Sequence, residues 1–200
     1  MNLTDFRIGF WHPFGPHSSE SANDIIERKA REIAANGWTL WSFQYRRMLD
    51  DWRGHLIQEA PNLVFVFCSA GGGKDPADRG GDAQAVDCRS YRLVGEAEWC
   101  AMPSQIRVPH TFPFGKGQAS AFVVRRIFHP VDPFEWPAVE WLTRGGEWRQ
   151  GFQQRQRWSP GIPSRGEYLI RRGGTSPMRR VGAILELKPP SYLAVVRTEP

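Results

Sequence analysis

The residues best suited to carry chemistry in this chain are the arginines and aromatic side chains of residues 144–180. This segment has a net charge of +7, against +5 for the whole chain, because it holds nine arginines and only two acidic residues. A guanidinium group offers a planar fork of N–H donors that matches phosphate oxygens, and aromatic faces stack on unpaired bases. The segment therefore predicts a surface that binds nucleic acid or a nucleotide. The residues expected to form it are Arg149, Arg155, Arg157, Arg171, Arg172, Arg179, Arg180, Trp148 and Trp158.

The charge is also uneven over the chain as a whole. Residues 1–100 carry a net −3 and residues 101–200 a net +8, and such asymmetry is typical of proteins with a polyanionic partner. However, 22 of the 26 basic residues are arginine, a bias that a GC-rich genome also produces. The alternative is therefore a solvated basic face, or a non-enzymatic interaction module whose arginines meet an acidic protein.

A second alternative rests on Glu186 and Lys188, which end the apolar run 181–188. A glutamate and a lysine separated by one residue on a strand, with another acid before them, form the metal-binding pattern of one class of nucleases. Two acids would hold Mg²⁺, and the lysine would position the attacking water. Glu167 or Asp132 could be the preceding acid, so the catalytic candidates are Glu186, Lys188 and Glu167. The simpler interpretation is a strand end with one outward charge, because two fixed residues often coincide by chance.

Three tryptophans on candidate strands or their edges form the third feature. Trp11, Trp41 and Trp99 could line a pocket for a flat ligand, such as a base taken out of its stack. The alternative is that they belong to the core, where alternate positions of a strand place aromatic side chains.

The histidines and cysteines predict neither a metal site nor a cofactor. His12 and His17 lie in one proline-bounded loop, with no second closely spaced pair nearby. The cysteines, Cys68, Cys88 and Cys100, are odd in number and form no CxxC pair. This usage favours a reducing, cytoplasmic setting, and Cys68 is expected to fill space in the core.

One helix is signalled more clearly than any other element. Ser21 can cap it, Asp24 can complete a capping box, and Gly37 can end it. Its expected buried face, at helical spacing, consists of Ile25, Ile26, Ala30, Ile33 and Ala34. Ion pairs at four-residue spacing are expected for Glu27 with Arg31 and for Arg28 with Glu32. An amphipathic helix of this kind is expected to cover a sheet.

The remaining elements are mostly strands. Strands are predicted at 6–11, 38–45, 63–68, 89–98, 119–129, 167–171, 181–188 and 192–197, the last two as a hairpin. Short helices are predicted at 50–59 and 137–143, and a flexible glycine-rich loop at 69–87.

Length and element order define the expected architecture. Two hundred residues suit a single domain, 1–200. Its fold class is expected to be α+β, with a curved mixed or antiparallel sheet, or a small β-barrel, flanked by a few helices. No apolar run reaches 18 residues, so no membrane-spanning helix is predicted. The start of the sequence lacks the pattern of a signal peptide, and the oligomeric state is not predicted.

Part of the chain resembles the PUA-like superfamily, including its ASCH and EVE branches. The segments that carry the resemblance are LVFVFC (63–68), YRLVGEAEW (91–99), ASAFVVRRIFHP (119–130) and RGEYLIRRG (165–173). Members of that superfamily use a small curved β-barrel, flanked by helices, to bind RNA or modified bases in DNA. The resemblance implies nucleic-acid or modified-nucleobase binding. It rests on strand order, so it assigns no site residue.

Overall fold

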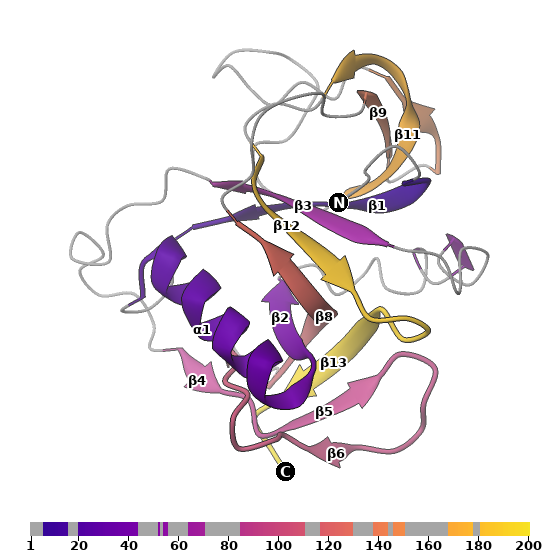
Figure 1. Cartoon of the computed structure of the whole chain (residues 1–200). Coiled ribbons are helices and arrows are strands. Elements are labelled where there is room, and N and C mark those ends of the chain that lie inside the picture. Colours follow the sequence, from indigo (N-terminus) through magenta and orange to yellow (C-terminus); the bar gives the residue numbers. More distant parts are fainter. Residues whose placement is uncertain are drawn as a thin grey trace.

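A long mixed β-sheet with one helix packed against it dominates the computed structural model of this chain (Figure 1). The described residues are 6–15, 20–43, 52, 54–55, 64–70, 85–110, 117–129, 138–143, 146–150, 168–177 and 181–200. The helix is α1 (Ala22–Asn36), which contacts strands β2 (Thr39–Phe43) and β8 (Gln118–Phe128). The expected role of this helix as the cover of a sheet is confirmed.

The other strands are β1 (Ile8–Phe14), β3 (Phe65–Ala70), β4 (Val86–Asp87), β5 (Ser90–Leu93), β6 (Cys100–Ala101), β7 (Pro109–His110), β9 (Ala138–Leu142), β10 (Trp148–Arg149), β11 (Tyr168–Pro177), β12 (Val181–Leu187) and β13 (Leu193–Arg197). The main sheet has the order β10-β9-β11-β1-β3-β12-β8-β13-β5-β6, with β2 also paired to β8, and β4 pairs with β7 separately. The β1–β3 pair is parallel and its neighbours are antiparallel, so the sheet is mixed.

The sheet is open. Among the described residues, β10 and β6 stand at its two ends and do not pair with each other. The α+β class with a mixed sheet is therefore confirmed. The alternative of a small β-barrel is wrong for the described part of the chain. Figure 1 shows β9 and β11 curling away at one end, with β5 and β6 at the other. α1 is the one full helix within the described ranges. Of the short helix predicted at 50–59, Trp52, Gly54 and His55 are described and are helical, and the other residues lie outside the described ranges.

The caps predicted for α1 are present. The Ser21 hydroxyl accepts the Asp24 N–H at 3.2 Å, and the Asp24 carboxylate accepts the Ser21 N–H at 3.0 Å. At the other end, Gly37 adopts φ +76° and donates its N–H to the Ile33 carbonyl at 2.7 Å. A left-handed residue at this position favours glycine. These bonds are local, which explains why the sequence predicts them.

The buried face of α1 agrees with the expected one in part. Ile26 is buried, and Ile25 and Ile33 pack against the main core. Ala30 and Ala34 are exposed, whereas the charged residues Lys29 and Glu32 are buried. Charged residues can be buried when they pair with each other and are hydrogen-bonded, and an apolar-periodicity argument places such residues on the outer face. The predicted ion pair between Arg28 and Glu32 is confirmed at 2.8 Å.

The predicted hairpin of β12 and β13 is wrong. Val123 of β8 accepts the Lys188 N–H at 2.8 Å and donates its own N–H to the Tyr192 carbonyl at 2.9 Å. The N–H and C=O of one residue in an antiparallel strand point to the same edge. The two strands therefore lie end to end along one edge of β8, and residues 188–192 bulge out between them. The eleven residues of β8 are long enough to pair with both strands in this way.

Two other expectations need correction. The sequence predicts a short helix at 137–143 with Pro137 in its first turn, but 138–142 form β9, since Val139 and Trp141 pack into the core beside β11. The glycine-rich loop expected at 69–87 is shorter at both ends. β3 runs through Ala70 and β4 begins at Val86, and residues 71–84 lie outside the described ranges.

A close approach of β1 to β3 depends on Gly9. A Cβ at Gly9 would lie 2.5 Å from the Phe65 carbonyl oxygen and 3.2 Å from the Phe6 ring. Without a side chain there, the Phe6 ring can pack over the sheet and meet the Phe67 ring edge-to-face, with centroids 5.1 Å apart. Phe6 and Phe67 belong to a second buried cluster with Trp11, which is separate from the main core that contains Phe10.

Candidate nucleic-acid interface

Strands β9, β10 and β11 form the end of the sheet that contains the described part of the arginine-rich segment. Arg171 pairs directly with Glu140, and Trp148 pairs with Leu142. Directly paired residues lie on the same face of a sheet, as do residues two apart along a strand. Arg171, Glu140 and Trp148 therefore share one face, although they come from three strands.

The guanidinium group of Arg171 is held in place on this face. Its Cζ lies 4.4 Å from the centroid of the Trp148 ring. Its Nε and Nη2 both lie 2.6 Å from Oε2 of Glu140. The Arg171 side chain remains 44% exposed, whereas the Glu140 side chain is 14% exposed. The carboxylate and the indole thus fix the guanidinium while leaving much of it in contact with solvent.

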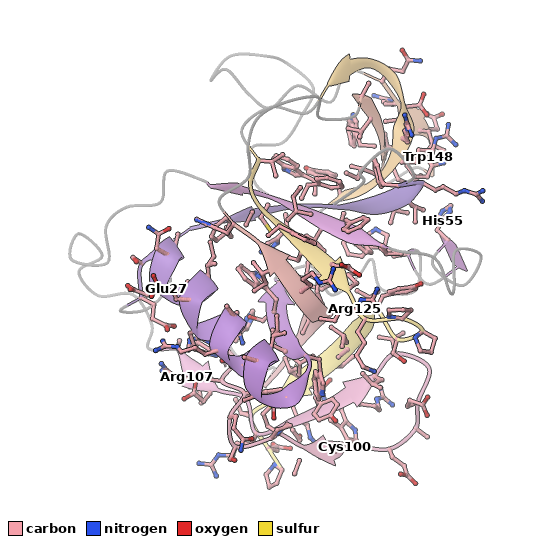
Figure 2. The ribbon with its side chains drawn as sticks, viewed as in Figure 1. Glu27, His55, Cys100, Arg107, Arg125 and Trp148 are labelled. Atoms are coloured by element: carbon pink, nitrogen blue, oxygen red, sulfur yellow. The ribbon has the colours of Figure 1, made fainter. Side chains whose placement is uncertain are left out.

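Two further residues shape this corner. The His55 ring meets Trp148 edge-to-face at 5.8 Å, and both side chains lie at the same end of the molecule (Figure 2). Gly174 has φ +79°, and a Cβ built on it would lie 3.6 Å from Cγ of Glu140 and 3.4 Å from the Val139 carbonyl oxygen. These are ordinary van der Waals distances, so the positive φ, and not lack of space, is what favours glycine at this position.

The other predicted nucleic-acid-binding residues divide into two groups. By strand alternation, Arg149 and Arg172 lie on the opposite face from Arg171. Both are exposed, and Arg149 lies 3.4 Å from the exposed Glu147 carboxylate. Of the four members of the predicted set that the structure describes, Trp148 and Arg171 are in contact, and Arg149 and Arg172 lie on the other face. The remaining predicted residues lie outside the described ranges, namely Arg155, Arg157, Trp158, Arg179 and Arg180.

The three candidate pocket tryptophans lie in different places. Trp41 is buried in the main core, where its indole N–H donates to Nε2 of His12 at 3.2 Å. Trp11 is buried in a separate cluster with Phe67. Trp99 is half-buried and belongs to neither cluster. The described residues therefore do not gather these tryptophans around one ligand.

The nuclease candidates have a different environment from the expected one. The Glu186 carboxylate is buried and accepts a hydrogen bond from Nε of Arg125 at 2.7 Å, while Nη1 of Arg126 lies 3.6 Å away. Lys188 is half-buried and follows the end of β12. Glu167 lies outside the described ranges. Within those ranges, the His, Cys, Asp and Glu side chains form no group of three or more that could hold a metal ion. Two guanidinium groups thus occupy the carboxylate that would have bound Mg²⁺.

A buried charge network lies beside α1, and the sequence predicts only one of its ion pairs. The Lys29 ammonium group donates to Glu32 at 2.8 Å, to the Arg107 carbonyl at 2.6 Å and to the Thr39 hydroxyl at 3.3 Å. Arg28 joins Glu32 to Glu20, with its Nε 2.6 Å from the Glu20 carboxylate. Burial lowers the pKa of Lys29 from 10.5 to about 8, although the neighbouring Glu32 acts in the opposite direction. The four-residue spacing of Arg28 and Glu32 predicts their ion pair. No local sequence pattern predicts the contact of Lys29 with the Arg107 carbonyl.

The cysteines show no sign of a reactive site. Cys68 and Cys88 are buried thiols, and Cys100 is an exposed one. Burial raises the pKa of both buried thiols, in the case of Cys88 to about 12. This agrees with the expected space-filling role of Cys68.

No protein-family model matches this chain, and comparisons with curated proteins and with solved structures give no match either. In the part of the chain that the structure describes, no helix has the length and apolar character needed to cross a bilayer.

Proposed function

We propose that this protein binds single-stranded nucleic acid or an unpaired nucleobase through the end of the sheet formed by β9, β10 and β11. The observation that carries the proposal is the Arg171 guanidinium, which is fixed on Trp148 by Glu140 and is 44% exposed. Unpaired bases stack on arginine planes as well as on aromatic rings. The Arg171 guanidinium, held against the Trp148 indole, therefore offers an oriented plane on which a base can stack.

The fixed geometry supports binding because it lowers the entropic cost of forming the contact. An exposed arginine side chain loses up to about 2 kcal/mol of rotamer freedom when it is immobilised. Glu140 and Trp148 have already restricted Arg171 in the unbound protein. A base that stacks on it therefore meets a guanidinium that is oriented beforehand, which is the general advantage of preorganisation.

The surrounding charge supports a polyanionic ligand. Arg149 and Arg172 are exposed on the opposite face of the same strands, where they can contact the phosphates of a strand that passes over the sheet edge. Residues 144–180 carry a net +7. Phosphate contacts of this kind give most of the affinity and its dependence on salt, whereas base stacking distinguishes single strands from duplexes.

The test is fluorescence-anisotropy binding to labelled single- and double-stranded DNA and RNA at several salt concentrations. We expect single strands to bind more tightly than duplexes, with affinity that falls as salt rises. Arg171→Lys keeps the charge but removes the plane, and should raise the Kd for single strands about tenfold, since a base stack contributes about 1–3 kcal/mol. The matched control is Arg31→Lys, an exposed position on α1.

Two results would overturn the proposal. The first is the absence of binding to any nucleic acid at low salt, which would favour an acidic protein as the partner of the arginines. The second is binding that Arg171→Lys leaves unchanged. The surroundings of Glu186 give no support to the nuclease alternative, because Arg125 and Arg126 already neutralise its carboxylate.

A further inference from the structure

A second tryptophan meets two guanidinium groups at the other end of the sheet. The Cζ of Arg197 lies 4.1 Å from the centroid of the Trp99 ring, and the Cζ of Arg92 lies 5.3 Å from it. Trp99 comes just before β6, Arg92 lies on β5 and Arg197 on β13. Figure 2 shows Cys100, the residue after Trp99, at the opposite end of the molecule from Trp148.

The strand register brings the two arginines together. β13 pairs with β5 in antiparallel fashion, with Val195 opposite Arg92 and Arg197 opposite Ser90. The arginines are therefore diagonal neighbours on one face of the sheet. Two positive charges are held close to one ring, and such a pair of like charges repels in the absence of an anion.

Hydrogen bonds orient one guanidinium and leave the other available. Arg197 donates from Nε to the Ser90 hydroxyl at 3.0 Å and from Nη2 to the backbone oxygen of Pro200. The main chain of Arg92 belongs to the β5–β13 ladder, but its guanidinium group has no hydrogen-bond acceptor among the described residues other than its contact with the Trp99 ring. Neither Arg92 nor Arg197 forms an ion pair with an acidic side chain in that part of the chain. The N–H donors of Arg92 and the remaining donors of Arg197 therefore have no acidic partner among the residues that the structure describes.

We propose that Arg92, Trp99 and Arg197 form a binding site for the phosphate group of a nucleotide. A phosphate placed beside both guanidinium groups would accept charge-assisted hydrogen bonds from them, and it would relieve their mutual repulsion. The indole holds both cations by cation–π contact. The phosphate could belong to a free nucleotide or to a nucleic-acid strand, because both present the same oxygens.

The test follows the indole N–H signal of Trp99 by NMR in the ¹⁵N-labelled full chain, with the signal assigned through Trp99→Phe. Adenosine monophosphate, adenosine and a short single-stranded DNA are added in turn. We expect saturable shifts with the monophosphate or the DNA and none with adenosine. A response to the monophosphate identifies a free nucleotide as sufficient, whereas a response to the DNA alone identifies the phosphodiester backbone.

The matched variants are Arg92→Gln and Arg89→Gln. Arg89 is exposed and lies three residues before Arg92, so both changes remove one nearby charge. We expect Arg92→Gln to raise the Kd about tenfold, the effect of losing a charged hydrogen bond, and Arg89→Gln to leave it within about twofold. Unchanged indole signals of the other tryptophans show that the variant is folded.

Three results would overturn the site: no shift with either phosphate ligand, an equal shift with adenosine, or equal affinity of both variants. These results are separable from failure of the proposed function. Arg171→Lys acts at the other end of the molecule and should leave the Trp99 titration unchanged, whether or not single strands bind at Arg171.

Discussion

The ammonium group of Lys29 lies 2.8 Å from the carboxylate of Glu32, three residues further along α1, and both side chains are buried. The same ammonium group bonds to the Arg107 carbonyl, and the same carboxylate accepts the Arg107 N–H at 3.1 Å. The pair therefore attaches α1 to the chain that precedes β7. This contact stabilises the position of the helix on the sheet.

The buried ammonium group predicts a pH dependence of stability. Its pKa is about 8 in the folded chain, against an ordinary value of 10.5. Between these values the unfolded chain binds a proton that the folded chain does not, so the free energy of unfolding rises with pH across this window. We expect this rise in the wild type and its loss in Lys29→Met, measured by urea unfolding from pH 7 to about pH 10.5.

Other groups titrate near this pH window, so the prediction concerns the difference between the pH profiles of stability of the wild type and of Lys29→Met. Glu32, Arg28, Glu20 and Arg107 surround the ammonium group. Burial raises the pKa of Cys88 to about 12, which lowers stability as pH rises above the ordinary thiol value in both proteins. An identical pH profile for wild type and Lys29→Met would contradict the prediction.

Substitution of Glu140 can distinguish binding that needs an oriented Arg171 guanidinium from binding by charge attraction alone. Glu140→Gln and Glu147→Gln each remove one negative charge from the β9–β10 end, but only Glu140 holds Arg171. If Arg171 must be oriented to stack on a base, Glu140→Gln should lower the ratio of single-strand to duplex affinity about threefold or more, and Glu147→Gln should not. Equal effects of the two changes, measured by anisotropy, would show that charge alone matters.

Glu186 is expected to be structural. Replacing it with Gln leaves Arg125 and Arg126 without their carboxylate partner and should lower the free energy of unfolding by about 1–2 kcal/mol. The exposed Glu96 gives the control variant, Glu96→Gln, which should change it by less than about 0.5 kcal/mol. Incubation with plasmid and Mg²⁺ tests the catalytic alternative, since cleavage that Glu186→Gln abolishes would restore the nuclease hypothesis.

We expect a side chain at position 9 to destabilise the fold. A Cβ there would lie 2.5 Å from the Phe65 carbonyl oxygen, so Gly9→Ala must separate β1 from β3 or shift Phe6. We expect a loss of about 2–3 kcal/mol in the free energy of unfolding by urea. Gly37→Ala, which meets no atom within 4 Å but has φ +76°, should lose only about 1 kcal/mol. A smaller loss at Gly9 than at Gly37 would contradict the described β1–β3 approach.

Taken alone, the sequence determined the elements that local interactions define. The caps of α1 at Ser21 and Gly37 are bonds between residues three or four positions apart, so their residue types are visible in the sequence. β3 and β8 were recognisable because a buried strand needs a continuous run of apolar and β-branched residues. The α+β class follows from this order of elements.

Only the tertiary structure decided how these elements pair and which charges meet. β12 and β13 follow each other closely along the chain, yet they do not pair with each other. β8 is long enough to pair with both of them, one after the other. Residues 138–142 became a strand because β11 lies beside them. Arg171 with Trp148, Arg92 with Trp99 and Lys29 with Arg107 are contacts between separate segments. Such contacts depend on register and packing, and no local pattern of residue types encodes them.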